Sequence, residues 1–132
     1  MTIFSKIASG EIPSYKVAET IEFLAFLDIN PLTEGHLLVI PKKETDYIFD
    51  LDDETYVELQ IFAKIVATGL RKAIPCLRIG VAVIGLDVPH AHIHLIPMNT
   101  VNDMNFSKPK LKFTPEEFSA TADKIRQALK PE

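Results

Sequence analysis

Two segments of the chain repeat apolar residues at helical spacing. In residues 52–73 an apolar side chain recurs every three or four positions, which places these side chains on one face of an α-helix. Asp52 is a suitable N-cap for this helix, acidic residues fill its first turn, and Pro75 follows its end. Residues 114–117 supply a threonine N-cap, a proline at N1 and a glutamate at N3, which predicts a second helix that ends near Leu129.

Five further segments have the compositions that are typical of strands. The first two are short, contain β-branched and aromatic residues, and indicate a hairpin. The third and fourth are nearly continuous apolar runs, which predicts that both are buried strands. A turn joins the fourth to the fifth, so these two are expected to pair antiparallel. The five segments are Tyr15–Glu19, Glu22–Asp28, His36–Ile40, Leu77–Ile84 and Pro89–Pro97.

The order of these elements indicates the fold class. A short apolar face over Thr2–Ala8 predicts one or two helical turns before the first strand. The order that follows is βββαββα, with short connections and no alternating βα units. This order favours an α+β fold, a five-stranded antiparallel sheet with helices on one side. Residues 98–113 are polar and contain Pro109, which predicts a long surface excursion.

The fifth strand segment carries an unusual row of histidines. Three of the four histidines in the chain, His90, His92 and His94, stand at every second position. Successive side chains of a strand point to opposite faces, so these three share one face, each about 6.7 Å from the next. The apolar residues between them then face the core. Imidazole titrates near neutral pH, so the row indicates a site mounted on a rigid element.

Three interpretations of the histidine row remain open from its spacing alone. The row can be the solvated face of a half-exposed strand. It can hold a metal, because strand histidines at i and i+2 can chelate zinc; His90 and His94 are roughly 13 Å apart along a strand, so a pair together with His36 is the better ligand set. The third interpretation is covalent catalysis. The central imidazole would attack phosphorus while its neighbours hold charge and move protons, which suits phosphoryl or nucleotidyl transfer.

Composition limits the class of protein and of partner. The 132 residues, 47% of them hydrophobic, fit a single domain over residues 1–132. A net charge of −4, with no basic run longer than Lys42-Lys43, argues against nucleic acid as a partner, so any nucleotide bound is small. The single cysteine, Cys76, excludes an internal disulfide and indicates a reducing compartment. We find no run of signal-peptide or membrane-spanning length and expect a cytoplasmic protein without membrane contact.

The histidine row and three other segments resemble a known family. Residues 90–96 match the pattern His-φ-His-φ-His-φ-φ, where φ is apolar, of the histidine triad (HIT) proteins, which are nucleotide-binding hydrolases and transferases. The likeness covers roughly residues 2–97 and leaves 98–132 as a more variable C-terminal segment that ends in a helix. It is greatest to the branch of homodimeric nucleoside phosphoramidases, whose two five-stranded sheets join into ten strands. The other segments are residues 3–7 with 10–13, residues 24–31 and residues 35–42.

The resemblance implies a role for each residue of the site. His92 would be the nucleophile that attacks the α-phosphorus and forms a nucleotidyl-histidine, later hydrolysed by water. His94 would contact the α-phosphate and assist the leaving group, while His90 and His36 would fix the orientation and tautomer of His92. Asp28 would hold the ribose hydroxyls. The remaining nucleotide-binding residues would be Phe4, Ile7, Phe26 and Ile29 around the base, and Asp87 and Val88 in the turn before the triad.

The chain departs from the family pattern at three places. Many relatives have Gln and Ser or Thr before the triad, where this chain has Leu86 and Asp87; Leu86 cannot donate to phosphate, and an ionised Asp87 would repel it. Some relatives bind a structural zinc at positions that correspond here to Thr2, Ser5 and Glu44, so that zinc site is expected to be absent. The chain also has no tryptophan, so the C-terminal aromatic that some relatives lend across the dimer is missing or replaced.

The resemblance therefore implies an enzyme that needs no metal and no cofactor. We expect it to cleave purine nucleoside 5′-phosphoramidates through His92, and to be a homodimer. One alternative is a dinucleoside polyphosphate hydrolase, which uses the same nucleophile with a nucleotide leaving group. The other is a nucleotide-binding regulatory module in which Leu86 and Asp87 have weakened catalysis.

Overall fold

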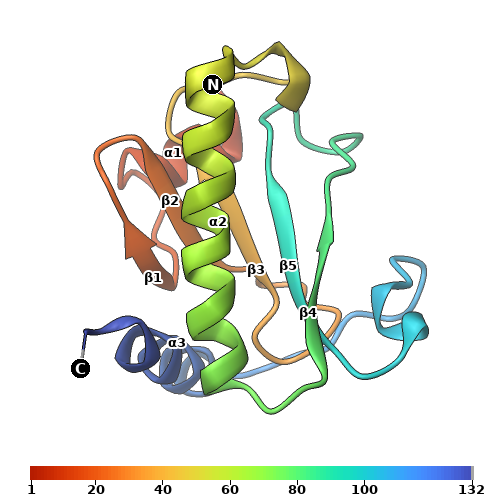
Figure 1. Ribbon diagram of the computed structural model, residues 1–132. Helices are drawn as coiled ribbons and strands as arrows, with labels where there is room; N and C mark the ends of the chain where they lie inside the picture. The colour runs from red at the N-terminus through yellow and green to blue at the C-terminus, as the bar shows by residue number, and fades with distance from the viewer. Residues whose placement is uncertain (132) are drawn as a thin grey trace.

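The computed structural model describes residues 1–131 and contains one five-stranded antiparallel sheet (Figure 1). The strand order is β1-β2-β3-β5-β4, and each neighbouring pair is antiparallel. The expected α+β fold and the β1–β2 hairpin are confirmed. In chain order the elements are α1 Ile3–Ala8, β1 Lys16–Glu19, β2 Phe23–Leu27, β3 Leu37–Pro41, η1 Ile48–Asp50, α2 Asp53–Ala73, β4 Arg78–Ala82, β5 Ile93–Met98, η2 Val101–Met104 and α3 Pro115–Leu129.

The two long helices begin where the sequence predicts, because their N-caps are satisfied. The Asp52 carboxylate accepts the backbone N–H of Thr55 at the start of α2. At the start of α3, the Thr114 hydroxyl accepts the N–H of Glu117, and the Glu117 carboxylate accepts the N–H of Thr114. Both predicted helices are therefore confirmed, including their caps. Among residues 1–131, no helix combines the length and apolarity that crossing a bilayer requires.

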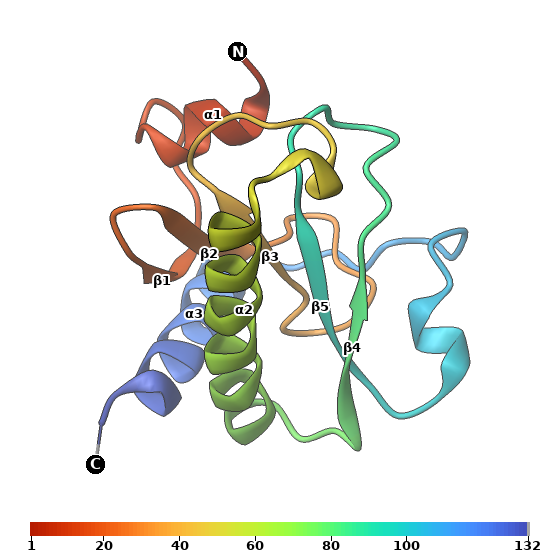
Figure 2. The same ribbon diagram turned by 45° about the horizontal axis from the view of Figure 1, so that its top comes forward.

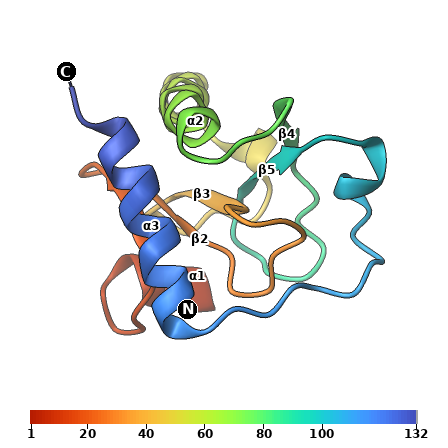
Figure 3. The same cartoon turned by 90° about the horizontal axis from the view of Figure 1, so that it is seen from below.

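The helices cover both faces of the sheet, whereas the sequence predicts helices on one side only. Helices α2 and α3 pack on one face and form the main core with it (Figures 1 and 2). The short α1 lies on the opposite face, as the view from below shows (Figure 3). The cause is that β2 and β3 are buried along their whole length, so both of their faces need apolar cover. The second, smaller core consists of Phe4, Ile7, Leu24, Phe26, Leu38 and Ile40.

The prediction that Leu77–Ile84 is a buried strand is wrong. Within this segment β4 is an edge strand of the described chain, paired only with β5, and Val81 in its centre is 60% exposed. A continuous apolar run is expected for a strand buried on both faces, but here the run lies at an open edge. The antiparallel pairing of β4 with β5 is confirmed.

The histidine row is only partly a strand. β5 begins at Ile93, so His94 lies in the strand, whereas His90 and His92 precede it. The alternation of faces nevertheless holds, because Ala91, Ile93 and Leu95 all belong to the main core beneath α2. The three histidines are 0%, 7% and 8% exposed in chain order, which excludes a solvated strand face.

The turn before β3 depends on a glycine, and replacing it tests the packing there. Gly35 has φ of +88°, and a Cβ at this position would lie 2.9 Å from Ile74 Cγ1 and 3.3 Å from Leu70 Cδ1. We expect Gly35→Ala to lower the free energy of unfolding by about 3 kcal/mol, from backbone strain plus overpacking. Gly10→Ala is the matched control, because Gly10 has φ of +83° with no described atom within 4 Å of an added Cβ. It should lose only about 1 kcal/mol in urea unfolding, and equal losses would contradict the packing argument.

Candidate active site

A cavity of about 400 Å³ lies on the sheet face that α1 covers, and its lining includes residues of α1, β2, the turn before β5 and the segment after η2. It brings together every site residue expected from the sequence except His90. Asp87 and Val88 form part of one wall, although they stand outside any helix or strand. The residues expected for the nucleotide that line the cavity are Phe4, Ile7, Phe26, Asp28, Ile29, Asp87 and Val88, together with His36, His92 and His94.

The apolar part of the cavity is built by α1 and β2. The side chains of Phe4, Ile7 and Phe26 are all buried, and the Phe4 ring meets the Phe26 ring edge-on at 5.8 Å between centroids. Ile29 differs from these three, because it is 61% exposed at the rim. Phe4 also lies edge-on to the His92 ring, with the centroids 4.9 Å apart. The apolar slot and the central histidine of the triad are therefore contiguous.

The backbone fixes the tautomer of His92. Its Nδ1 lies 2.7 Å from the carbonyl oxygen of His90. A carbonyl oxygen can only accept a hydrogen bond, so Nδ1 carries the proton. In the neutral ring Nε2 then holds a lone pair, and Nε2 is the nitrogen able to attack an electrophile.

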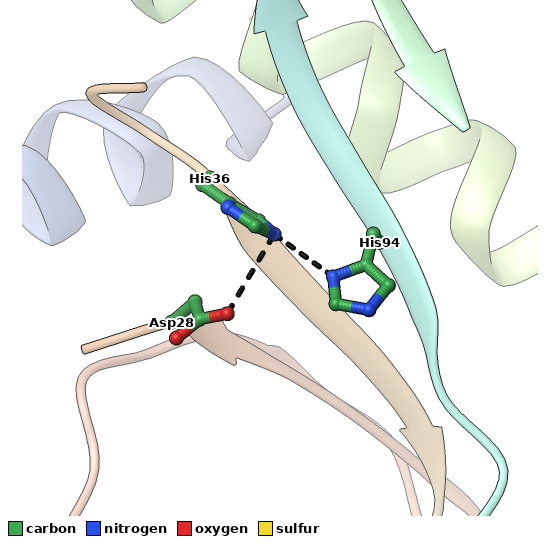
Figure 4. Close-up of side chains that lie close together, drawn as sticks. All are labelled: Asp28, His36 and His94. Atoms are coloured by element: carbon green, nitrogen blue, oxygen red, sulfur yellow. Dashed lines mark hydrogen bonds and ion pairs between the residues drawn. The ribbon is translucent and has the colours of Figure 1, made fainter. Parts of the chain in front are cut away.

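His36 and His94 form a second, separate hydrogen-bonded pair (Figure 4). The backbone N–H of Leu32 points at His36 Nδ1 from 3.0 Å, so Nδ1 accepts and the proton of the neutral ring is on Nε2. Nε2–H then donates to His94 Nδ1 at 2.9 Å. The proton of His94 is consequently on its own Nε2, on the far side of its ring from His36 (Figure 4). His94 can therefore donate a hydrogen bond to a phosphate oxygen or to a departing atom.

Burial keeps this pair uncharged. It lowers the pKa of His36 to about 3, with further lowering from the nearby charges of His94 and Lys110. Burial, followed by the charge of His92, lowers the pKa of His94 to about 4. Both rings are neutral at pH 7, so the pair works by directed hydrogen bonds rather than by positive charge.

Asp28 extends the His36–His94 pair toward the rim of the cavity. Its Oδ2 lies 3.7 Å from His36 Nε2, and its Oδ1 accepts the N–H of Asn30 at 2.8 Å (Figure 4). Burial raises the pKa of the Asp28 carboxyl, and the Asn30 hydrogen bond offsets part of this rise. Because His36 is neutral at pH 7, the 3.7 Å contact is no ion pair, and the carboxylate keeps accepting capacity for a ligand.

The same three side chains are the one group of described residues with metal-ligand geometry. Asp28, His36 and His94 can each place a ligand atom within 4.8 Å of the others. A metal at His36 Nε2 would require the ring proton on Nδ1. Two donors, Nδ1–H and the N–H of Leu32, would then face each other, which is unfavourable. The hydrogen-bond pattern thus favours a proton-bearing relay over a metal site.

His90 lies outside the cavity, behind His92, and its ring is bonded at both nitrogens. Its Nε2–H donates to the carbonyl oxygen of Pro41 at 2.7 Å. Its Nδ1 faces the hydroxyls of Thr2 at 3.0 Å and Ser5 at 3.3 Å. Thr2 and Ser5 form a hydrogen-bonded cluster with Glu44.

The sequence did not predict that the segment between η2 and α3 contributes two residues to the cavity. Phe106 and Lys110 come from the segment between η2 and α3, for which the sequence predicts only a surface excursion. The Phe106 ring lies edge-on to His94 at 4.9 Å between centroids. Lys110 is the only Lys or Arg among the described residues that line the cavity, and its Nζ donates to the carbonyl oxygens of Phe106 and Lys108. The two aromatic residues of this polar stretch, Phe106 and Phe113, were the available signal.

Comparisons with known proteins agree with this fold. Residues 9–101 match the HIT domain, and the chain belongs to the HIT family. The adenosine 5′-monophosphoramidase of Schizosaccharomyces pombe is 35% identical over 130 residues, which covers 97% of this chain and 98% of the relative.

Two crystal structures extend the likeness to nearly the whole chain. A HIT-like protein involved in cell-cycle regulation from Bartonella henselae has a TM-score of 0.83 and 32% identity, covering 96% of this chain and 95% of its own. A hypothetical histidine triad nucleotide-binding protein from Sulfolobus tokodaii has a TM-score of 0.82 and 29% identity, covering 96% and 90%. The resemblance to the HIT family is therefore confirmed.

The buried neutral histidines predict a loss of stability in acid. The pKa of His36 falls from 6.5 in the unfolded chain to about 3 in the folded protein, so the unfolded chain takes up the proton first. Stability is therefore full above about pH 6.5 and falls as the pH is lowered toward 3, by about 1 kcal/mol per pH unit for this residue. His36→Gln keeps a donor near His94 but cannot titrate. Urea unfolding between pH 6.5 and 4.5 should give a shallower slope for the variant, whereas parallel slopes would contradict the assignment.

Proposed function

We propose that the protein hydrolyses purine nucleoside 5′-phosphoramidates and releases the nucleoside monophosphate. The observation that carries this proposal is the lone pair on His92 Nε2, which the bond from Nδ1 to the His90 carbonyl oxygen directs away from the backbone. His92 lies in the wall of a cavity that also holds an apolar slot and a carboxylate. The naming of the Schizosaccharomyces pombe relative as an adenosine 5′-monophosphoramidase supports the choice of substrate.

The nucleotide takes its position from three parts of the cavity. The base enters the slot of Phe4, Ile7, Phe26 and Ile29. The ribose hydroxyls donate to Asp28, a carboxylate with accepting capacity left beyond the Asn30 hydrogen bond. The α-phosphate then lies against His92 and His94, beside the turn that contains Asp87 and Val88.

The reaction proceeds in two displacements at phosphorus. His92 Nε2 forms a bond to the α-phosphorus as the bond to the amine nitrogen breaks, which gives a nucleotidyl-histidine. Water then attacks the same phosphorus and breaks the bond to His92. In the first step the departing nitrogen takes a proton from solvent and leaves as the neutral amine, and in the second step the attacking water returns a proton to solvent, so one water is consumed overall. His94 Nε2–H assists by donating to a phosphate oxygen or to the departing nitrogen.

Turnover of two substrate types, combined with His92→Ala, tests this proposal. We expect amine release from adenosine 5′-phosphoramidate to exceed cleavage of a diadenosine polyphosphate. His92→Ala should lower kcat by at least about 10³-fold, because the nucleophile is lost. AMP binding by calorimetry checks that the variant keeps its pocket, and mass spectrometry after an alkaline quench, which preserves a phosphorus–nitrogen bond, should detect the nucleotidyl-protein in wild type only.

Each alternative has its own outcome in this experiment. Faster cleavage of the diadenosine polyphosphate would favour the dinucleoside polyphosphate hydrolase. Tight AMP binding with no turnover and no covalent species would favour the regulatory module, in which Leu86 and Asp87 replace donors to phosphate. Unchanged turnover in His92→Ala would sink both hydrolase interpretations.

We also propose that two copies associate through α2 and β4. Val57, Ile61 and Ile65 repeat every four residues on α2 and are 53%, 54% and 60% exposed, which makes a continuous apolar stripe. The neighbouring edge strand β4 exposes Val81 and has backbone groups without a partner strand on its outer side within the described chain. A two-fold copy placed there would cover the stripe and join two five-stranded sheets into ten strands.

The association can be tested with one charged substitution on α2. Ile61→Glu should place like charges across the two-fold axis and convert a dimer of the 14.8 kDa chain into a monomer at micromolar concentration. Ile21→Glu is the matched control, because Ile21 is 94% exposed in the turn between β1 and β2 and lies away from the stripe. Light scattering measures the molar mass of wild type and of both variants, and Ile21→Glu should remain a dimer. A monomeric wild type would contradict the proposal.

A further inference from the structure

A polar cluster behind the catalytic histidine has no part in the reaction described above. Thr2, Ser5 and Glu44 gather at the start of α1, next to the buried ring of His90. They come from the first residues of the chain and from the segment that leaves β3, which lies beside α1 (Figure 2). The cluster does not line the substrate cavity, and both of its hydroxyls lie within hydrogen-bond distance of one ring nitrogen, His90 Nδ1.

The direction of each hydrogen bond can be assigned. Ser5 Oγ donates to Glu44 Oε1 at 2.6 Å, and the same oxygen accepts the backbone N–H of Thr2 at 2.7 Å. Thr2 Oγ1 accepts the backbone N–H of Ser5 at 3.0 Å, which is the N-cap bond of α1. With the Ser5 proton directed to Glu44, the Thr2 hydroxyl proton has two acceptors, Ser5 Oγ at 3.3 Å and His90 Nδ1 at 3.0 Å, and we assign it to the nearer one, His90 Nδ1.

These bonds hold the His90 ring at both ends. Nδ1 accepts from Thr2, and Nε2–H donates to the carbonyl oxygen of Pro41 at 2.7 Å. Both hydrogen bonds require the tautomer with the proton on Nε2, so one orientation of the ring satisfies both nitrogens. The carbonyl oxygen of the same residue accepts from His92 Nδ1 at 2.7 Å. The ring and this carbonyl oxygen belong to the same residue, so a shift of the His90 backbone that follows the loss of a ring contact also moves the acceptor of the His92 proton.

We propose that Thr2, supported by Ser5 and Glu44, is a positioning residue that acts through His90 on the tautomer of His92. The inference rests on the proposed role of His92 as nucleophile. The Thr2 hydroxyl performs two tasks at once, because it caps α1 and donates to His90. Helix α1 also carries Phe4, whose ring is 6.0 Å from His90 and 4.9 Å from His92 between centroids.

Thr2→Val tests the proposal, because valine keeps the shape of threonine and removes the hydroxyl. The variant also loses the N-cap of α1, so the experiment needs a control variant that loses the N-cap of a different helix. Thr114→Val removes the same cap chemistry from α3, which does not line the cavity. Thr2→Ser restores the hydroxyl. Two readouts apply to all three variants: kcat and KM for adenosine 5′-phosphoramidate, and the ring ¹⁵N spectrum of His92.

In Thr2→Val we expect kcat to fall by about tenfold while KM changes by less than about twofold. The His92 spectrum should then show a second tautomer with its proton on Nε2. Thr2→Ser should restore both values, and Thr114→Val should match wild type. A single Nδ1–H tautomer in Thr2→Val, or an equal loss of kcat in Thr114→Val, would overturn the proposal. The spectrum requires no substrate, so an inactive wild type would refute the proposed function and still leave this inference decided.

Discussion

The hydrogen bond from His92 Nδ1 to the carbonyl oxygen of His90 is the constraint on which the site depends. A carbonyl oxygen has no proton to give, so the bond holds the His92 proton on the backbone side of the ring. In the neutral ring the lone pair is then on Nε2, and no neighbouring base is needed to remove a proton from that nitrogen. The apolar slot, the Asp28 carboxylate and the His36–His94 pair gain a chemical role only because this one nitrogen is presented to them.

The hydrogen bonds of the site histidines form two separate sets. One begins at the N–H of Leu32 and ends at His94 Nε2–H, a donor. The other is the bond from His92 Nδ1–H to the backbone carbonyl oxygen of His90, which leaves His92 Nε2 as an acceptor. A donor and a lone pair are thus prepared by separate parts of the backbone. Because burial keeps the His36–His94 pair neutral, the permanent positive charge in the cavity lining comes from Lys110, on a different segment.

The sequence was sufficient where the determining signal is local. The caps of α2 and α3 are set by residues within one turn, and these were predicted together with their helices. The apolar run that contains β4 is compatible both with a strand buried on both faces and with an edge strand. The prediction of a buried strand was wrong because the run does not distinguish the two. The positions of Phe106 and Lys110 depend on the path of a long connection across the sheet. The tautomer assignments depend on atoms such as the N–H of Leu32, which only the folded backbone brings to the ring.

The connection from η2 to α3 has a mechanical consequence. It leaves the sheet beside β5, runs beneath the sheet, and is anchored again where α3 packs on β1 at the opposite edge (Figure 3). Between these anchors the N–H of Leu111 is tied to the carbonyl oxygen of Pro31, near the cavity rim. The connection therefore works as a tie across the sheet. Phe106 lies on this connection, so the path of the connection between its anchors decides where the Phe106 ring packs on His94.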